Sequence, residues 1–415
     1  MSPSPRAALL LGAIAVATAF VGVAFGVLAA LALVAATLAD ALAVRRPPRI
    51  ERTVAPVLAR GVASPLTVET TPDGPGRVRV RQPVPPDLGL EPREGEELLR
   101  AKLMPLRRGR HTLGPVAART QGPLGLGRWH HRGQEEKEVL VYPDLPGAQR
   151  LAMAVRQGRF REQGRLTRGP MGLGTDFESI RDYAPDDDIR QVNWRATERM
   201  QRPMSNQFRI EQDREVMVLL DAGRLMAAPL GDRTRLDTAV DAAVAVALVA
   251  DAVGDRCGAV AFDDAIRRRI SPRRAGGDRV VRALFDLEPQ PVDSDYELAF
   301  RTVEGAKRSL ILVLCDLLEE AAARPLVDAV PVLARRHVVI VASVRDPDLD
   351  AKLSTPPQAP LDVYGQSVAL DVLGARARVA HGLERAGAQV LEAPAGALPA
   401  ACVRAYLRAK ARARL

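Results

Sequence analysis

Two aspartates stand where buried strands are expected to end. Asp221 closes the apolar run 215–221, and Asp316 closes the run 309–316. In sheets of parallel strands, ligands bind beyond the carboxyl ends of the strands. We therefore expect Asp221 and Asp316 to stand at that edge of a sheet and to contribute to a partner-binding site.

A second concentration of charge lies upstream, in residues 172–194, which we call the signature stretch. Its candidate partner-binding residues are Arg181, Asp182, Asp187, Asp188, Arg190 and Trp194. They form either a face that docks a protein partner or internal ion pairs that pin the segment to the next domain, with Trp194 as an interdomain plug. Because arginine and aspartate so interleaved can neutralise one another, internal pairing is favoured.

The same stretch predicts a helix. Pro185 is followed by three carboxylates, which can cap exposed N–H groups and complement the helix dipole. Apolar residues then recur at helical spacing, at Ile189, Val192, Ala196 and Met200.

Signals for catalysis are weak. None of the five histidines has the helical spacing of a metalloprotease site, and no Walker-type Gly-Lys-Ser/Thr is present. Gly172 and Gly174 lack the third glycine and the preceding strand of a nucleotide-binding turn. The acidic run 186–188 lacks companion His or Lys residues for a metal-dependent phosphoryl reaction. We predict no intrinsic catalysis and no cofactor, and the sequence identifies no small-molecule substrate.

Residues 213–415 alternate apolar strands with helices. The predicted elements are strands at 215–221, 258–262, 309–316 and 337–342, a short strand from Val390, and helices near 236–253 and 279–287. Continuous apolar runs belong to strands that are covered on both faces. The pattern predicts an α/β domain with a doubly wound, mostly parallel sheet.

Residues 47–142 instead show short period-two runs broken by proline and glycine, which predict a small antiparallel β-sandwich that acts as a spacer. Residues 45–142 carry 18 basic and 11 acidic groups, a balance of +7 in a chain of net charge +9. This excess lies beside an apolar N-terminus. Anionic lipid headgroups are therefore favoured over nucleic acid as its counter-ions.

Residues 1–46 contain the apolar N-terminus. From Ala7 to Val44 the one charge is Asp40, and this stretch would measure about 57 Å as one helix against a hydrocarbon core of about 30 Å. Two spans with a turn between Gly22 and Gly26 fit this length. Alternatively, the two glycines form a packing face within a single span. Arginine at both ends favours a transmembrane helical hairpin with both ends in the cytoplasm, whereas a single span exports the rest of the chain.

Composition and cysteine usage bound the class of protein. The chain is 47% hydrophobic and 26% charged, which excludes a disordered or collagen-like protein. Cys257, Cys315 and Cys402 are odd in number and widely spaced, so buried free thiols in a reducing compartment explain them better than disulfides. We expect a multi-pass protein of the cell membrane whose soluble bulk is cytoplasmic.

The order of these motifs resembles one bacterial family. The strand ending at Asp221, the apolar helix 236–253 and the strand ending at Asp316 resemble a von Willebrand factor A-type domain. With Asp176-Phe-Glu-Ser-Ile-Arg-Asp-Tyr, Asp187-Asp188-Ile-Arg and Asn193-Trp194 upstream, the chain resembles the domain of unknown function fifty-eight family. The resemblance implies four parts, namely a hairpin at 1–46, a β-rich domain at 47–142, a signature segment at 143–212 packed on the next domain, and an A-like domain at 213–415.

The resemblance also implies a degraded magnesium site. A typical A-type domain binds a divalent ion through Asp-x-Ser-x-Ser, a later Thr and a further Asp. Here the first motif reads Asp221-Ala-Gly-Arg-Leu, so both hydroxyl groups are missing. Asp316 fits the last position, and the loop 293–296 offers a Ser or an Asp. Arg224 is expected to supply the neutralising charge in place of an ion.

Family members resemble partners of MoxR-class AAA+ ATPases, with proposed roles in chaperone-like or envelope assembly work. We therefore expect a membrane-anchored interaction module that recruits such an ATPase or its client and binds without turnover. An exported structural or adhesion module and a metal-dependent phosphoesterase are the alternatives. The sequence leaves the partner, the pathway and the oligomeric state open.

Overall fold

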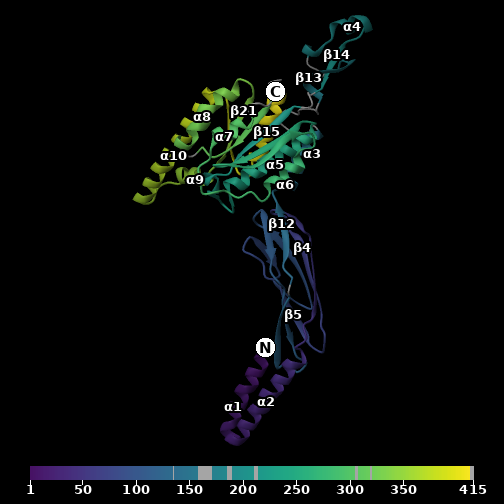
Figure 1. Cartoon of the computed structure of the whole chain (residues 1–415), viewed down its shortest axis with the longest axis vertical. Coiled ribbons are helices and arrows are strands. Elements are labelled where there is room, and N and C mark those ends of the chain that lie inside the picture. The colour runs from purple at the N-terminus through teal and green to yellow at the C-terminus, as the bar shows by residue number, and fades with distance from the viewer. Residues whose placement is uncertain are drawn as a thin grey trace. The chain divides into compact units, whose positions relative to one another are not determined.

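The chain has a mixed α/β fold with apolar helices at its N-terminus and several sheets (Figure 1). This computed structural model describes residues 1–133, 135–157, 171–184, 189–209, 214–303, 307–317 and 320–411. The chain divides into two compact units, Met1–Tyr142 and Pro143–Leu415.

The first unit begins with two apolar helices, α1 (Pro5–Val21) and α2 (Val23–Ala43). The Ser4 hydroxyl caps α1 by accepting a hydrogen bond from the Ala7 N–H at 3.2 Å. Gly22, at φ +106°, separates the two helices. This backbone conformation is strained for any other residue, which explains why glycine stands at the break. One continuous helix is therefore wrong, and the break lies at the first glycine of the predicted turn.

The two helices pack against each other (Figure 1). A Cβ added at Gly26 of α2 would overlap the Thr18 side chain of α1, so glycine allows the close approach. Over its most apolar window, α2 has a mean hydropathy of 2.1, and only 11% of that window is buried. By length and composition α2 can therefore cross a membrane, whereas α1, with 17 residues, is shorter.

Three sheets make up the rest of the first unit. Their strands are β1 (Ser2–Pro3), β2 (Arg49–Val54), β3 (Val57–Ala59), β4 (Ser64–Thr71), β5 (Arg77–Arg81), β6 (Leu88–Glu91), β7 (Glu94–Glu96), β8 (Leu98–Pro105), β9 (Gly109–Leu113), β10 (Ala117–Gln121), β11 (Gly127–Arg132) and β12 (Lys137–Tyr142). The sheets have the orders β1-β11-β10-β5-β7, β2-β4-β8-β6 and β3-β12-β9. The β3–β12 pair is parallel, so a purely antiparallel segment is wrong at this point.

The period-two pattern explains how these sheets share one core. Every second residue of β5 and β8 is buried, and the others face outward. Val78 and Val80 meet Leu99, Leu103 and Val139 in a single apolar cluster. The outward residues of β5 are all arginines.

The second unit contains a six-stranded sheet and two small hairpins. Its elements are α3 (Leu145–Arg156), β13 (Met171–Asp182), η1 (Ile189–Gln191), α4 (Trp194–Met200), β14 (Met204–Arg209), β15 (Glu215–Asp221), η2 (Arg224–Ala227), β16 (Pro229–Leu230), β17 (Arg233–Thr234), α5 (Arg235–Ala252), β18 (Arg256–Phe262), β19 (Ile266–Arg273), α6 (Gly277–Leu284), α7 (Tyr296–Arg301), β20 (Leu310–Leu314), α8 (Glu320–Ala334), β21 (Val338–Arg345), α9 (Pro347–Ser354), α10 (Pro360–Arg385), β22 (Gln389–Pro394) and α11 (Leu398–Ala411).

The large sheet has the order β19-β18-β15-β20-β21-β22. All its neighbours pair in parallel except β19, an antiparallel edge strand that the sequence pattern did not predict. Met217 and Leu219 of β15 face a core cluster with α7, α8 and α10. Because side chains alternate along a strand, the buried residues between them face the opposite side, where α5 contacts β15.

Two further sequence predictions meet the structure here. Cys257, Cys315 and Cys402 are buried free thiols, as predicted. A single helix through residues 189–200 is wrong, because η1 ends at Gln191 and α4 begins at Trp194. Asn193 interrupts the helix by capping α4 with a hydrogen bond from the Ala196 N–H to its Oδ1 at 3.0 Å.

Candidate functional site

Asp221 closes β15 and is 3% exposed. Its Oδ1 accepts hydrogen bonds from the Ser294 hydroxyl at 2.5 Å and the Gly223 N–H at 2.8 Å, and its Oδ2 accepts one from the Tyr296 hydroxyl at 2.7 Å. Burial raises the pKa of Asp221, and the Asp263 carboxylate adds to this, while the three hydrogen bonds oppose it. Asp221 is thus a buried carboxyl group held by three neutral donors.

The loop after α6 reaches this carboxyl group through Ser294, as its sequence suggested. Arg224 does not reach it. The Arg224 Nε donates to Asp293 Oδ1 at 2.5 Å, and both side chains are largely exposed. The prediction that Arg224 neutralises Asp221 is therefore wrong, because Asp293 offers the guanidinium an ion pair that does not require burial.

Asp316 lies two residues beyond β20 and is 4% exposed. The guanidinium of Arg235, the first residue of α5, donates to its Oδ2. The Arg376 Nη2 from α10 lies 3.7 Å from its Oδ1. Arg235 also donates through Nη2 to Asp346 Oδ2 at 3.0 Å. Asp316 therefore sits in a buried charge network that joins α5, α10 and the start of α9.

Arg376 extends this network to the neighbouring strands. Its Nη2 donates to the Ser343 hydroxyl at 3.1 Å and to the Val344 carbonyl at 2.7 Å, and its Nε lies 3.5 Å from Glu392. The carboxyl ends of β20, β21 and β22 are thus linked by one guanidinium. We call Asp316, Arg235, Arg376 and Asp346 the strand-end network.

These residues do not fit the divalent ion that A-type domains hold. Gly223 and Leu225 stand where the two hydroxyl ligands would be, and the Asp316 carboxylate is already engaged by Arg235. Across the described residues, no group of three His, Cys, Asp or Glu side chains is placed to hold a metal ion. The charge that an ion would supply at Asp316 is supplied instead by two guanidinium groups.

Asp263 is a strand-end carboxylate that our sequence analysis missed. It follows β18, is completely buried, and accepts hydrogen bonds from the Arg267 side chain and, at 2.9 Å, from the Ala265 N–H. The rule that singled out Asp221 and Asp316 applies equally to Asp263, so the signal was present in the sequence.

Replacing Asp221 with asparagine should flatten the pH dependence of the stability of the second unit. A carboxyl group whose folded pKa is raised stabilises the fold fully below its unfolded pKa, near 3.9, and loses this contribution as pH rises through the folded pKa. The asparagine side chain cannot ionise, so D221N should gain stability relative to the native chain as pH rises from about 4 to about 7. Thermal melts across this range check the prediction, with D293N as the exposed control. Parallel curves for D221N and the native chain would contradict it.

The signature stretch forms a local hairpin in which β13 pairs with β14. Arg181 and Asp182 lie at the end of β13, and Asp182 pairs with Arg202 at 3.2 Å. Asp187 and Asp188 lie outside the described residues, and Arg190 is described only as a backbone position in η1. The described site residues therefore lie in two places, the hairpin segment and the end of the large sheet.

Trp194 begins α4 and is 70% exposed. Three other apolar side chains of the same segment are exposed as well, at 70% for Ile189, 50% for Met200 and 40% for Ile180. The interpretation of Trp194 as a buried plug is therefore wrong in this structure. We call Ile180, Ile189, Trp194 and Met200 the hairpin apolar cluster.

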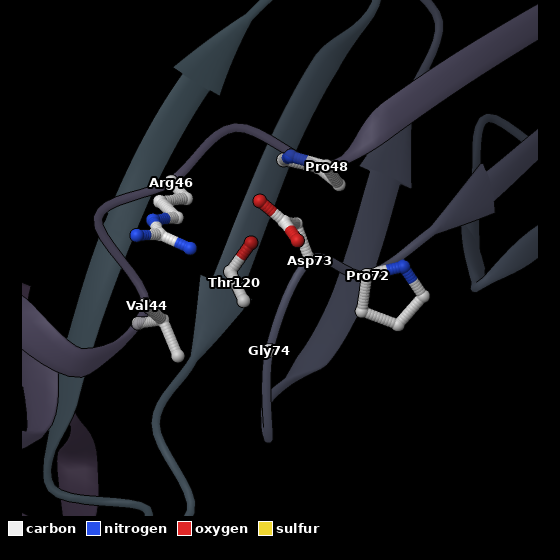
Figure 2. A pocket seen from close by; sticks show the side chains of 7 residues that line it. All are labelled: Val44, Arg46, Pro48, Pro72, Asp73, Gly74 and Thr120. Atoms are coloured by element: carbon white, nitrogen blue, oxygen red, sulfur yellow. The ribbon is translucent and has the colours of Figure 1, made fainter.

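Two hollows of the described surface lie away from these residues. A hollow of about 10 Å³ in the first unit has space for one water molecule, and Figure 2 shows Arg46, Asp73 and Thr120 among the side chains that line it. A hollow of about 430 Å³ in the second unit is lined by residues that include Glu215, at the start of β15 and away from Asp221. Neither suggests a small-molecule site at the strand ends.

Comparison with known proteins identifies relatives of part of the chain. Uncharacterized proteins of Mycobacterium tuberculosis and Mycobacterium bovis are each 26% identical over 184 residues, which is 42% of this chain and 56% of theirs. The chain thus spans about half the length of the curated relatives it matches.

Solved structures offer only weak similarity. An uncharacterized membrane spanning protein from Vibrio fischeri is 15% identical, with 49% of this chain and all of that chain covered at a TM-score of 0.17. The sulfur carrier protein SoxY from Chlorobium limicola is 20% identical, with coverages of 26% and 97% at a TM-score of 0.13. These scores are too low to support an argument about fold.

A family model gives the clearer result. It is described as protein of unknown function DUF58 and matches residues 179–378, from the end of β13 to the middle of α10. This range includes Arg181, Trp194, Asp221 and Asp316. Residues 179–378 of the chain therefore match this family of unknown function.

Proposed function

We propose that the chain is a membrane-anchored interaction module that recruits a MoxR-class AAA+ ATPase or its client and performs no chemistry of its own. The observation that supports this most is the exposure of Trp194 within the hairpin apolar cluster. Tryptophan is enriched among the residues that dominate the binding energy of protein interfaces.

Charge next to the cluster gives such a contact a polar rim. Arg181 and Asp182 are exposed beside Ile180, and the Arg181 Nη1 donates to the Asp182 carbonyl at 2.9 Å. An apolar centre with a charged margin is the usual composition of a protein interface. In this proposal Asp187, Asp188 and Arg190 belong to the same margin.

The large sheet serves as the scaffold of the module. We propose that residues 213–415 form a von Willebrand factor A-like, doubly wound domain in which the strand-end network replaces the divalent ion. Recognition by this domain would then be independent of magnesium. Asp221 and Asp316, being buried, would support the surface rather than contact the partner.

The anchor is proposed to be a two-span hairpin formed by α1 and α2. Their separation at Gly22 and their packing through Gly26 and Thr18 support it, as does the arginine on both flanks of the apolar stretch. Both ends of the hairpin would then face the cytoplasm, where a cytoplasmic ATPase can reach the second unit.

The Trp194→Ala substitution should abolish recruitment without altering the fold. Loss of a dominant interface tryptophan costs about 2 kcal/mol or more, which weakens binding by roughly 30-fold. The full chain, tagged at its C-terminus, is used to pull down the ATPase from native membranes. Tyr364→Ala is the matched control, because Tyr364 on α10 is an aromatic residue of similar exposure, 69%.

Two outcomes would contradict the proposal. One is equal recovery of the ATPase by the native chain and W194A at equal melting temperature. The other is cleavage of residues 143–415 by protease added to intact cells, which would favour the exported module instead.

A further inference from the structure

Across three strands of the five-stranded sheet in the first unit, one face is rich in arginine. The strand register places Arg79, Arg119 and His130 directly opposite one another across β5, β10 and β11. The neighbouring rows on the same face are Arg77, Gln121 and Arg128 on one side and Arg81, Ala117 and Arg132 on the other. We call these nine positions the arginine face. Six of them are arginine.

Carboxylates neutralise only one margin of this face. Glu96 and Glu94 of β7 pair with Arg79 at 3.1 Å and with Arg81 at 4.0 Å. In the described part of the chain, no carboxylate lies within 4.0 Å of the remaining arginines of the face, which are Arg77, Arg119, Arg128 and Arg132. Among the residues that the structure describes, these four therefore have no carboxylate at ion-pair distance.

Burial and neighbouring positive charge both act on Arg128 and His130 of this face. Burial and the neighbouring Arg119 and Arg79 lower the pKa of Arg128. Burial, the N-terminal amine, Arg119 and Arg128 lower the pKa of His130. Like charges directly opposite each other destabilise a sheet. A face built in this way gains stability when an anionic surface covers it.

The arginine face adjoins the ends of the apolar helices. Ser2 and Pro3, which precede α1, pair with Arg128 and Gly127 of β11. At the end of α2, the Asp40 carboxylate accepts hydrogen bonds from the N–H groups of Leu124, Leu126 and Gly127 at 2.8–2.9 Å, in the turn between β10 and β11. The row of Arg77, Gln121 and Arg128 therefore begins where the helices end.

Two further contacts place the row of Arg77, Gln121 and Arg128 next to the ends of the helices. A Cβ added at Gly76 would lie 2.8 Å from Val44, the residue that follows α2. The Arg6 guanidinium, from the first turn of α1, lies beside Gly125 and the Gln121 side chain and so extends the basic surface towards the helices. Successive rows along the strands are about 6.7 Å apart, so the third row lies about 13 Å from the first. This distance is slightly more than one Debye length at physiological salt.

We propose that the arginine face binds the anionic headgroups of the bilayer leaflet from which the β unit emerges. This inference rests on the membrane anchoring proposed above. Charge complementarity and continuity with the anchor favour lipid over other polyanions. A surface for single-stranded nucleic acid uses aromatic side chains on which bases stack, and none of the nine positions is aromatic other than His130.

The test compares bilayers of two compositions. The full chain is reconstituted into vesicles of phosphatidylcholine alone or of phosphatidylcholine and phosphatidylglycerol in equal parts, and thermal unfolding of the first unit is followed. Because a ligand that binds only the folded state raises its stability, the midpoint should rise in the anionic vesicles and fall back as salt is added. R77Q/R119Q/R132Q should lose most of this rise.

A matched variant controls for the change in net charge. R100Q/K102Q/R110Q removes three exposed positive charges from other sheets of the same unit, and it should keep the full rise. Glycerol phosphate added to neutral vesicles should not reproduce the effect, since it lacks the surface density of a leaflet.

An equal rise in both triple variants, or no rise in the native chain, would overturn the proposal. So would stabilisation by an oligonucleotide in neutral vesicles that R77Q/R119Q/R132Q abolishes while phosphatidylglycerol has no effect. If the membrane anchor itself is wrong, an alkaline wash should release the chain from neutral vesicles. If the proposed recruitment of an ATPase is wrong, the pull-down shows it independently of lipid charge.

Discussion

Replacing Arg235 with methionine should lower the free energy of unfolding of the second unit by about 3–5 kcal/mol, because it leaves a buried carboxylate without its principal counter-charge. The Arg235 side chain is 6% exposed and those of Asp316 and Asp346 are 1% and 18% exposed. Arg376, with its Nη2 at 3.7 Å from Asp316, offers only partial compensation. Thermal melts should show a midpoint lowered by roughly 10 °C.

The companion variant tests whether the uncompensated charge is the cause. R235M/D316N removes the guanidinium and the charge it neutralises together, and it should recover much of the loss. R224M, which removes an exposed guanidinium near the other strand end, should change the midpoint little. A loss for R235M comparable to that for R224M would show that the strand-end network does not hold this edge of the sheet together.

Replacing Asp40 with alanine should have a comparable effect on the first unit. Three backbone N–H groups donate to this one carboxylate, and hydrogen bonds to charged groups contribute about 1.5–3 kcal/mol each, so we expect a loss of about 4 kcal/mol or more. The Leu124–Gly127 turn should also become a site of cleavage by protease, because the carboxylate that orders it is gone. Limited proteolysis and a melt of the full chain in bilayers check both effects.

Asp73→Ala provides the matched control, since Asp73 is an exposed carboxylate in the same unit. The stability and protease resistance of Asp40→Asn should lie between those of D40A and D73A. The single amide oxygen of asparagine can accept only some of the hydrogen bonds that the two carboxylate oxygens accept. A D40A chain as stable and as resistant to protease as D73A would show that the turn is held by other contacts.

Continuous apolar strands were the most predictable part of the fold. Runs such as 215–221 and 309–316 have no polar alternation, and the structure has β15 and β20 at nearly these bounds. Glycine was equally informative at residue 22, where the backbone needs a positive φ. The strand β19 was missed because its sequence, Ile266–Arg273, is dominated by arginine and lies at an edge that only tertiary pairing defines.

The candidate site was predictable only where its signal was local. Asp221 follows its strand directly, and Ser294 was suggested by the loop that contains it. Arg235 and Arg376 could not be found in this way, since their partner Asp316 is 81 and 60 residues away along the chain. Arginine is also found at the first position of helices whose termini are exposed to solvent. An arginine at the start of an apolar helix therefore does not by itself indicate that its side chain is buried.

The signature stretch misled for a physical reason. Interleaved Arg and Asp suggested that the segment packs on the next domain with Trp194 as a plug between them. In the structure Trp194 is exposed. Apolar periodicity across 189–200 was real, but Asn193 can cap a new helix as readily as continue an old one, and the periodic pattern does not distinguish these outcomes.

The bond between Asp40 and the β10–β11 turn imposes an order on biogenesis. Its partners stand 84 to 87 residues later in the chain, so α2 leaves the ribosome well before they exist. During that interval the Asp40 carboxylate lacks these three backbone donors and must be hydrated instead. Docking of the newly made sheet onto the helices is therefore a late step in maturation, and in a chain stalled before residue 127 the Asp40 carboxylate would have no turn to order.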